Sequence, residues 1–105
     1  MKAGLALNPK TSLSFIEPFV PSVDLVLFLS VEPGFQGRGF VASVLDKITE
    51  FRNRFPKVII GIDGGVKLEN FTFVAQSGVN EIVIGSGIWK TRDPAKTYEE
   101  FHNLI

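Results

Sequence analysis

One aspartate stands where a carboxylate could take part in catalysis. Asp63 directly follows the apolar run Val58 to Ile62 and begins a glycine turn. A carboxylate at the end of a buried strand can transfer a proton or bind a metal ion. It can equally cap the next helix or close the turn, and the residues alone leave both interpretations open. Glu32 has a comparable place before a proline, with weaker grounds for a function.

Glycine-rich turns follow three of the apolar runs, and they could bind phosphate. Glycine lets a phosphate approach backbone N–H groups closely, and the N-terminus of a following helix favours an anion. One such cluster alone is better explained as a tight turn, but three at corresponding strand ends favour a phosphate site. The clusters are Gly34-Phe35-Gln36-Gly37, Gly64-Gly65 and Gly85-Ser86-Gly87.

The elements that must position these residues alternate along the chain. Short apolar runs predict strands at Ala3 to Leu7, Leu25 to Val31, Val58 to Ile62 and Glu81 to Ile84. Helical spacing predicts helices at Leu13 to Val20, Phe40 to Phe51, Leu68 to Gln76 and Pro94 to Leu104. The pattern predicts an α/β fold with a parallel sheet, either an open doubly wound sheet or part of a (β/α)8 barrel. Because a complete barrel needs about 250 residues, four βα units would form half a TIM barrel.

Composition limits the kinds of partner. The 105 residues carry a formal net charge of zero, which favours neither nucleic acid nor an anionic membrane. The absence of cysteine excludes disulfides and thiolate metal sites, and fits a reducing compartment. No apolar run approaches the roughly 20 residues that span a bilayer. We therefore expect a soluble, cytoplasmic protein that binds no nucleic acid and no membrane.

Four ordered motifs together resemble ribulose-phosphate 3-epimerase. They are GLALNP at Gly4 to Pro9, VEPGFQGRGF at Val31 to Phe40, IDGGV at Ile62 to Val66 and VIGSGIW at Val83 to Trp89. The resemblance covers the C-terminal half of that family, its strands five to eight. It implies that residues 1–105 are a single C-terminal half-barrel segment of a ribulose-phosphate-binding (β/α)8 barrel.

The resemblance also implies a reaction, an isomerisation. The family interconverts D-ribulose 5-phosphate and D-xylulose 5-phosphate in the pentose phosphate pathway and the Calvin cycle. Removing the proton at C3 gives an enediolate, whose charge a divalent metal such as zinc, iron(II), manganese or cobalt can stabilise. Inversion needs a second acid on the opposite face of the substrate. Two aspartates fill these roles in the family and bind the metal with two histidines.

Matched motif by motif, the resemblance assigns roles to residues of this chain. Asp63 corresponds to one of the two aspartates, as acid/base and metal ligand. Two positions depart from the family pattern: Gln36 stands where a glycine is usual, and Leu29 where a methionine usually lines the metal site. The resemblance assigns substrate and phosphate binding to Gly34, Phe35, Gln36, Gly37, Gly64, Gly65, Gly85 and Ser86.

The other half of the family's site has no counterpart in this sequence. The N-terminal half of the family carries the second aspartate, both metal-binding histidines and an early serine. The one histidine of this sequence, His102, lies in the last expected helix, where we expect it to have a packing or surface role. We therefore expect the isolated chain to lack full epimerase activity. It would work with the missing N-terminal half, or else be a non-catalytic half-barrel that pairs with a second copy of itself and retains phosphate binding. A related barrel enzyme acting on another sugar phosphate is a third hypothesis.

Overall fold

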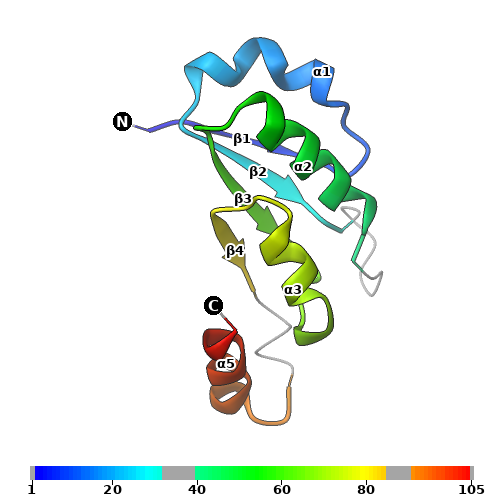
Figure 1. Ribbon diagram of the computed structural model, residues 1–105, viewed down its shortest axis with the longest axis vertical. Coiled ribbons are helices and arrows are strands. Elements are labelled where there is room, and N and C mark those ends of the chain that lie inside the picture. Colours follow the sequence, from blue (N-terminus) through cyan, green and yellow to red (C-terminus); the bar gives the residue numbers. More distant parts are fainter. Residues whose placement is uncertain (1, 32–39, 85–90, 105) are drawn as a thin grey trace.

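The computed structural model describes residues 2–31, 40–84 and 91–104. In these residues the strands form one parallel sheet in the order β1-β2-β3-β4, which confirms the predicted architecture (Figure 1). The elements are β1 (Gly4–Leu7), α1 (Leu13–Ile16), the 3₁₀ helix η1 (Glu17–Ser22), β2 (Leu25–Leu29), α2 (Ser43–Arg54), β3 (Ile59–Asp63), α3 (Leu68–Gln76), β4 (Glu81–Val83) and α5 (Pro94–Asn103).

Most predicted boundaries differ from the structure by a few residues, and the differences described next show why. Asp63 is the last residue of β3 rather than the first residue after it. The helix expected from Phe40 begins at Ser43, although Phe40 still packs against the core. The short helix expected before Pro21 becomes 3₁₀ from Glu17 onward, because the prolines of this stretch cannot donate α-helical hydrogen bonds.

The ends of three helices agree with the capping residues in the sequence. Asp93 accepts a hydrogen bond from the Lys96 N–H and so caps α5, as expected, at a distance of 3.2 Å. Ser12 caps α1 in the same way through the Ser14 N–H. Gly78, directly after the C-cap of α3, has φ +114°, a conformation that glycine adopts without strain.

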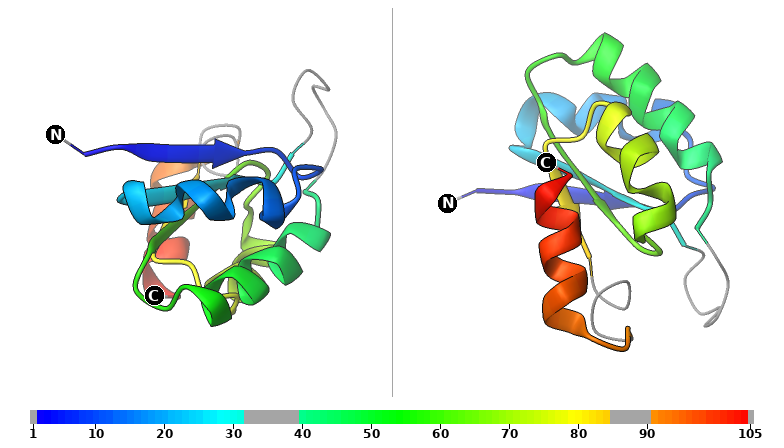
Figure 2. Two further views of the ribbon diagram at one scale, coloured as in Figure 1. Left: turned by 90° about the horizontal axis from the view of Figure 1, so that it is seen from above. Right: turned by 60° about the horizontal axis from the view of Figure 1, so that its bottom comes forward.

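The helices cover one side of the sheet and form the core there (Figure 2). Alternate residues of the strands, Val26 and Phe28 in β2 and Ile60 and Ile62 in β3, are fully or almost fully buried under these helices. The Phe51 ring of α2 packs edge-on against Phe28, with ring centroids 5.6 Å apart. Burying these apolar side chains is the main source of stability for the chain.

The opposite side of the sheet carries no helix among the described residues (Figure 2). We call it the open face. Apart from Asp63 and Glu81 it is apolar, and Ile59 and Val83 are 40% and 48% exposed there. Its strands β1 and β4 each have one neighbour in the described sheet, so both edges are unpaired. The side chains of the open face, assigned by strand alternation and register, are Ala6, Leu25, Leu27, Leu29, Ile59, Asp63, Glu81 and Val83, with Gly4 and Gly61 between them.

One arginine ties together the amino ends of β3 and β4. Arg52 of α2 donates to the carbonyl oxygens of residues 55, 56, 58 and 78 and to Asn80 Oδ1. Asn80 Oδ1 in turn accepts from the Ile60 N–H at 2.9 Å. This end of the sheet is therefore held by charge-assisted hydrogen bonds, opposite the end where the chemistry is expected.

Among the described residues, no helix combines the length and apolar character needed to cross a bilayer.

Candidate functional site

The side chain of Asp63 lies on the open face at the carboxyl end of β3. Ile60 and Ile62 point into the helix-covered core, so alternation places Asp63 on the opposite side. Its register partners are Leu29 of β2 and Val83 of β4. Asp63 is half-buried, which leaves the carboxylate accessible from the face that carries no helix. The geometry fits a group that meets a ligand above the strand ends.

The turn after Asp63 requires both of its glycines. Gly64 and Gly65 have φ values of +121° and +70°, which other residues rarely adopt. A Cβ on Gly64 would lie 2.9 Å from Val31 Cγ2, and one on Gly65 would lie 3.2 Å from the Phe40 Cα. The residues that flank the segment 32–39 on either side therefore pack directly against this turn.

A buried serine holds the turn from the helix side of the sheet. Ser30 is fully buried, and its backbone N–H donates to the Asp63 carbonyl oxygen at 2.8 Å. Its hydroxyl lies within hydrogen-bonding distance of the carbonyl oxygens of Asp63, at 3.1 Å, and Gly64. Its own carbonyl accepts from the Val41 N–H at 2.8 Å. Ser30 thus connects the end of β3 with both sides of the segment 32–39.

Asn70 of α3 holds the far side of the same turn. Its amide nitrogen donates to the Gly65 carbonyl at 3.0 Å, and its oxygen accepts from the Lys67 N–H at 2.9 Å. The second bond satisfies a donor just before α3, and the first fixes the glycine turn relative to that helix. All three carbonyl groups from Asp63 to Gly65 are therefore hydrogen-bonded.

Neither Ser30 nor Asn70 was identified from the sequence as a site residue. A signal for Ser30 was present, because strand alternation puts it on the same side as Val26 and Phe28. A hydroxyl buried on that side needs a hydrogen-bond partner. Asn70 had no comparable signal, because a polar residue in the first turn of a helix is common for many reasons.

The structure brings together only part of the predicted site. Asp63, Gly64 and Gly65 form one continuous turn at the carboxyl end of β3, beside Leu29. The remaining predicted residues lie outside the described part of the chain and keep the status of expectations. They are Gly34, Phe35, Gln36, Gly37, Gly85 and Ser86.

The described residues do not by themselves make a metal site. Among residues 2–31, 40–84 and 91–104, no group of three or more histidine, cysteine, aspartate or glutamate side chains is placed to hold a metal ion. Asp63 could supply one oxygen ligand, but catalytic zinc typically takes three protein ligands. Any metal bound by Asp63 would need most of its ligands from elsewhere.

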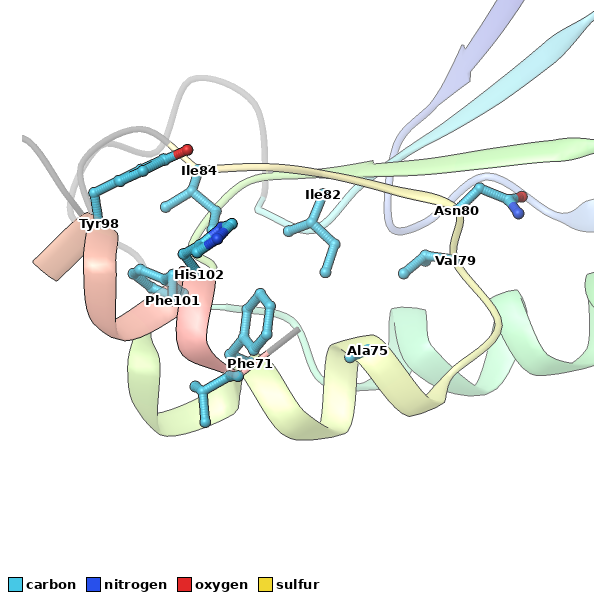
Figure 3. Close-up of a pocket in the computed structure, with 10 residues that line it drawn as sticks. Phe71, Ala75, Val79, Asn80, Ile82, Ile84, Tyr98, Phe101 and His102 are labelled. Carbon is cyan, nitrogen blue, oxygen red and sulfur yellow. The ribbon is translucent and has the colours of Figure 1, made fainter.

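An apolar pocket lies away from Asp63, between α3, β4 and α5 (Figure 3). Its volume is about 550 Å³, and its lining is mainly apolar, with Phe71 from α3, Ile82 from β4 and Phe101 from α5. His102 also lines it and stacks on Tyr98, with ring centroids 6.2 Å apart. Since this pocket lies on the helix side of the sheet, His102 does not share a face with Asp63. His102 is exposed at the pocket, in agreement with the packing or surface role expected for it.

Comparison with solved structures supports the barrel architecture. Orotidine 5'-monophosphate decarboxylase from Sulfolobus solfataricus, a TIM barrel, superposes on 97% of this chain and 60% of its own chain, with a TM-score of 0.52. The two sequences are 16% identical, so the likeness concerns the fold alone.

Comparison with curated sequences identifies much nearer relatives. A ribulose-phosphate 3-epimerase of Buchnera aphidicola from Schizaphis graminum is 46% identical over 88% of this chain and 42% of its own length. The ribulose-phosphate 3-epimerase of Escherichia coli K12 is 37% identical over 99% of this chain and 48% of its own length. That of Schizosaccharomyces pombe is 34% identical over all of this chain and 46% of its own length. The chain therefore spans less than half the length of these relatives.

The sequence model of the ribulose-phosphate 3 epimerase family also matches this chain, in agreement with these relatives and with the order of the motifs. It matches residues 1–89, which include all four strands and the turn after Asp63. By this match, the chain belongs to the ribulose-phosphate 3-epimerase family.

Proposed function

We propose that this chain contributes Asp63 and a phosphate-binding turn to an epimerase that interconverts D-ribulose 5-phosphate and D-xylulose 5-phosphate. One observation carries the proposal: among the described residues, Asp63 is the carboxylate that lies on the open face at the carboxyl end of a strand, and two glycines with positive φ follow it at once. A carboxylate of this kind can transfer a proton, and the backbone beside it is suited to a phosphate, which together support the proposal.

Asp63 acts in this proposal as the acid or base on one side of the substrate. The reaction removes the proton from C3, next to the ketone, and returns a proton to the other side of the same carbon. One carboxylate fixed at the end of β3 can reach only one of those sides. The second acid must therefore come from outside the described residues of this chain.

The phosphate group would be held by backbone N–H groups. Gly64 and Gly65 have no side chains to obstruct the approach, and α3 begins at Leu68, so its positive N-terminal end lies close by. We assign the same role to Gly34, Phe35, Gln36 and Gly37 and to Gly85 and Ser86, which follow β2 and β4 in the sequence. The carboxyl ends of parallel strands meet at one edge of a sheet, which supports this grouping.

A divalent metal would stabilise the negative charge of the enediolate as a Lewis acid. Zinc, iron(II), manganese and cobalt are the candidates that the family resemblance implies. Asp63 would be one ligand, and the described part of the chain offers no cluster that could complete the site. The remaining ligands would accompany the second acid.

The open face supports the need for a second half. Leu25, Leu27 and Leu29 line it on β2, and exposed Ile59 and Val83 extend it across β3 and β4. Such a surface, with two unpaired strand edges, favours association. In the proposed enzyme, a second set of four βα units covers the open face. The site is active only when that set is present, and we place the enzyme in the cytoplasm.

A second candidate function rests on the same surface. Two copies of this chain could cover each other's open face and retain phosphate binding without epimerase activity. The self-associating form predicts a dimer in sedimentation at micromolar concentration. A monomer across the whole concentration range would contradict it.

A complementation assay tests the proposal. The chain is mixed with the part of the Escherichia coli relative that it does not match, in the presence of zinc or iron(II). Formation of D-xylulose 5-phosphate is then followed with a coupled assay. We expect turnover from the mixture and little from either part alone. The matched control is Asp46→Asn, which changes an exposed carboxylate on α2 and should leave turnover intact. A folded mixture that gives no turnover would contradict the proposal.

A further inference from the structure

We propose that Ser30 is a positioning residue for the phosphate site, which directs the N–H groups of the Gly64-Gly65 turn toward the substrate. The inference rests on the proposed function, because it names how that site is held in shape. Ser30 does not touch the substrate in this account. It acts through the backbone of Asp63 and Gly64.

The first line of support is that each polar group of Ser30 has a partner. Its N–H and hydroxyl converge on the Asp63 carbonyl, its hydroxyl also reaches the Gly64 carbonyl, and its carbonyl accepts from Val41. The side chain is completely buried beside apolar neighbours of β2. An alanine would suit that environment better if packing were the only requirement, because burying a hydroxyl costs free energy unless it is hydrogen-bonded.

The second line of support is the geometry of the peptide bond. The described peptide bonds are all trans, so each N–H points opposite to the carbonyl of the same peptide unit. Ser30 holds the carbonyls of Asp63 and Gly64 toward itself, and its N–H bond to the Asp63 carbonyl continues the ladder between β2 and β3. The N–H groups of Gly64 and Gly65, which belong to those two peptide units, are therefore directed away from Ser30.

The third line of support is the position of Ser30 at a junction. The Val41 N–H donates to its carbonyl, so Ser30 and Val41 are joined across the segment 32–39. Val31 and Phe40 pack against the glycines of the turn. Ser30 thus sets the position of the glycine turn relative to the two flanks of the segment 32–39. The proposed phosphate-binding residues Gly34 to Gly37 belong to that segment.

The test compares two substitutions of Ser30 with a matched control. Ser30→Ala removes the hydroxyl, and Ser30→Cys keeps a similar shape with a weaker donor. Ser77→Ala removes another buried serine hydroxyl, which donates to the Val74 carbonyl at 2.6 Å, near the C-terminus of α3. Binding of D-ribulose 5-phosphate to the chain combined with the complementary part of the Escherichia coli relative is measured by calorimetry, and amide hydrogen exchange is measured by NMR at Gly64 and Gly65.

We expect Ser30→Ala and Ser30→Cys to weaken D-ribulose 5-phosphate binding by about tenfold, which corresponds to one lost hydrogen bond. Exchange at the two glycine amides should rise in both variants. Ser77→Ala should change neither readout, even if its melting temperature falls as far as that of Ser30→Ala. If the alanine variant fails to fold, Ser30→Cys still shows whether the Ser30 hydroxyl positions the glycine turn.

Two outcomes would overturn the inference. One is unchanged binding and unchanged glycine exchange in a folded Ser30 variant. The other is equal loss of binding in Ser77→Ala, which would mean that only general stability matters. Failure of the unmodified chain, combined with that complementary part, to bind D-ribulose 5-phosphate would contradict the proposed function instead, and the exchange measurement would still decide whether Ser30 sets the turn.

Discussion

Leu27 lies over Gly61 on the open face, so that a Cβ built on Gly61 would come within 3.0 Å of Leu27 Cδ1. The two residues are register partners in β2 and β3. Leu27 and Gly61 thus form part of an apolar surface that no described helix covers. A second set of βα units could bury such a surface.

The first prediction concerns this surface. Leu27→Glu should abolish association with a complementing half or a second copy, because it would bury an unpaired charge at the interface. The isolated chain should lose only about 1 kcal/mol in its free energy of unfolding, since position 27 is only partly buried. Phe15→Glu, which changes an exposed aromatic on α1, is the control and should leave association intact. Sedimentation and urea denaturation check the two effects, and equal association of both variants would argue against the open face as the interface.

The second prediction concerns the glycine turn. Gly64→Ala should lower the free energy of unfolding by about 1–3 kcal/mol, because the residue must keep a positive φ. It should also weaken binding of D-ribulose 5-phosphate. Gly78→Ala, at the opposite end of the sheet with φ +114°, should cost similar stability with unchanged binding. If both variants lose binding equally, the turn has no specific role in the phosphate site.

The third prediction concerns the arginine at the amino ends of β3 and β4. Arg52→Lys should lower the free energy of unfolding by about 1–3 kcal/mol, because lysine cannot reproduce the fork of donors that reaches several carbonyls. Arg54→Lys, two residues later, changes ion pairs with Glu17 and Glu50 that are partly exposed, and should cost less than about 0.5 kcal/mol. Urea denaturation measures both, and a larger loss for Arg54→Lys would contradict this account.

The fourth prediction concerns the second anchor of the turn. Asn70→Asp keeps the acceptor for the Lys67 N–H but replaces the donor to the Gly65 carbonyl with an oxygen. Repulsion between the two oxygens should shift the turn and weaken D-ribulose 5-phosphate binding by about tenfold, while α3 keeps its N-terminal hydrogen bond. Calorimetry and circular dichroism separate the two effects. Unchanged binding would show that Asn70 does not position the turn.

Much of the fold could be predicted because its signals are local. The continuous apolar runs at β2 and β3 and the glycine after α3 each reflect burial or backbone conformation at that position. The boundary errors arose where a competing effect acts within a few residues. At η1, two prolines favour a 3₁₀ helix, and at Asp63 strand pairing with Leu29 and Val83 continues one residue beyond the apolar run.

The site was less predictable because its support comes from distant residues. Asp63 and its two glycines are adjacent in the sequence and could be found together. The contact of Ser30 with Gly64 spans 34 positions and depends on the register between β2 and β3. No periodicity within either segment specifies that register, which is set only when the strands pair.

The most direct test of the central claim is hydrogen exchange at C3 of D-ribulose 5-phosphate in deuterated water. The chain is combined with the complementary part of the Escherichia coli relative, and loss of the C3 proton signal is followed by NMR. We predict exchange with the unmodified chain and a loss of at least about a hundredfold in Asp63→Asn, the scale of removing a general acid or base. Equal exchange rates with Asp63→Asn, in a folded and associated sample, would contradict the assignment of Asp63 as the catalytic acid or base.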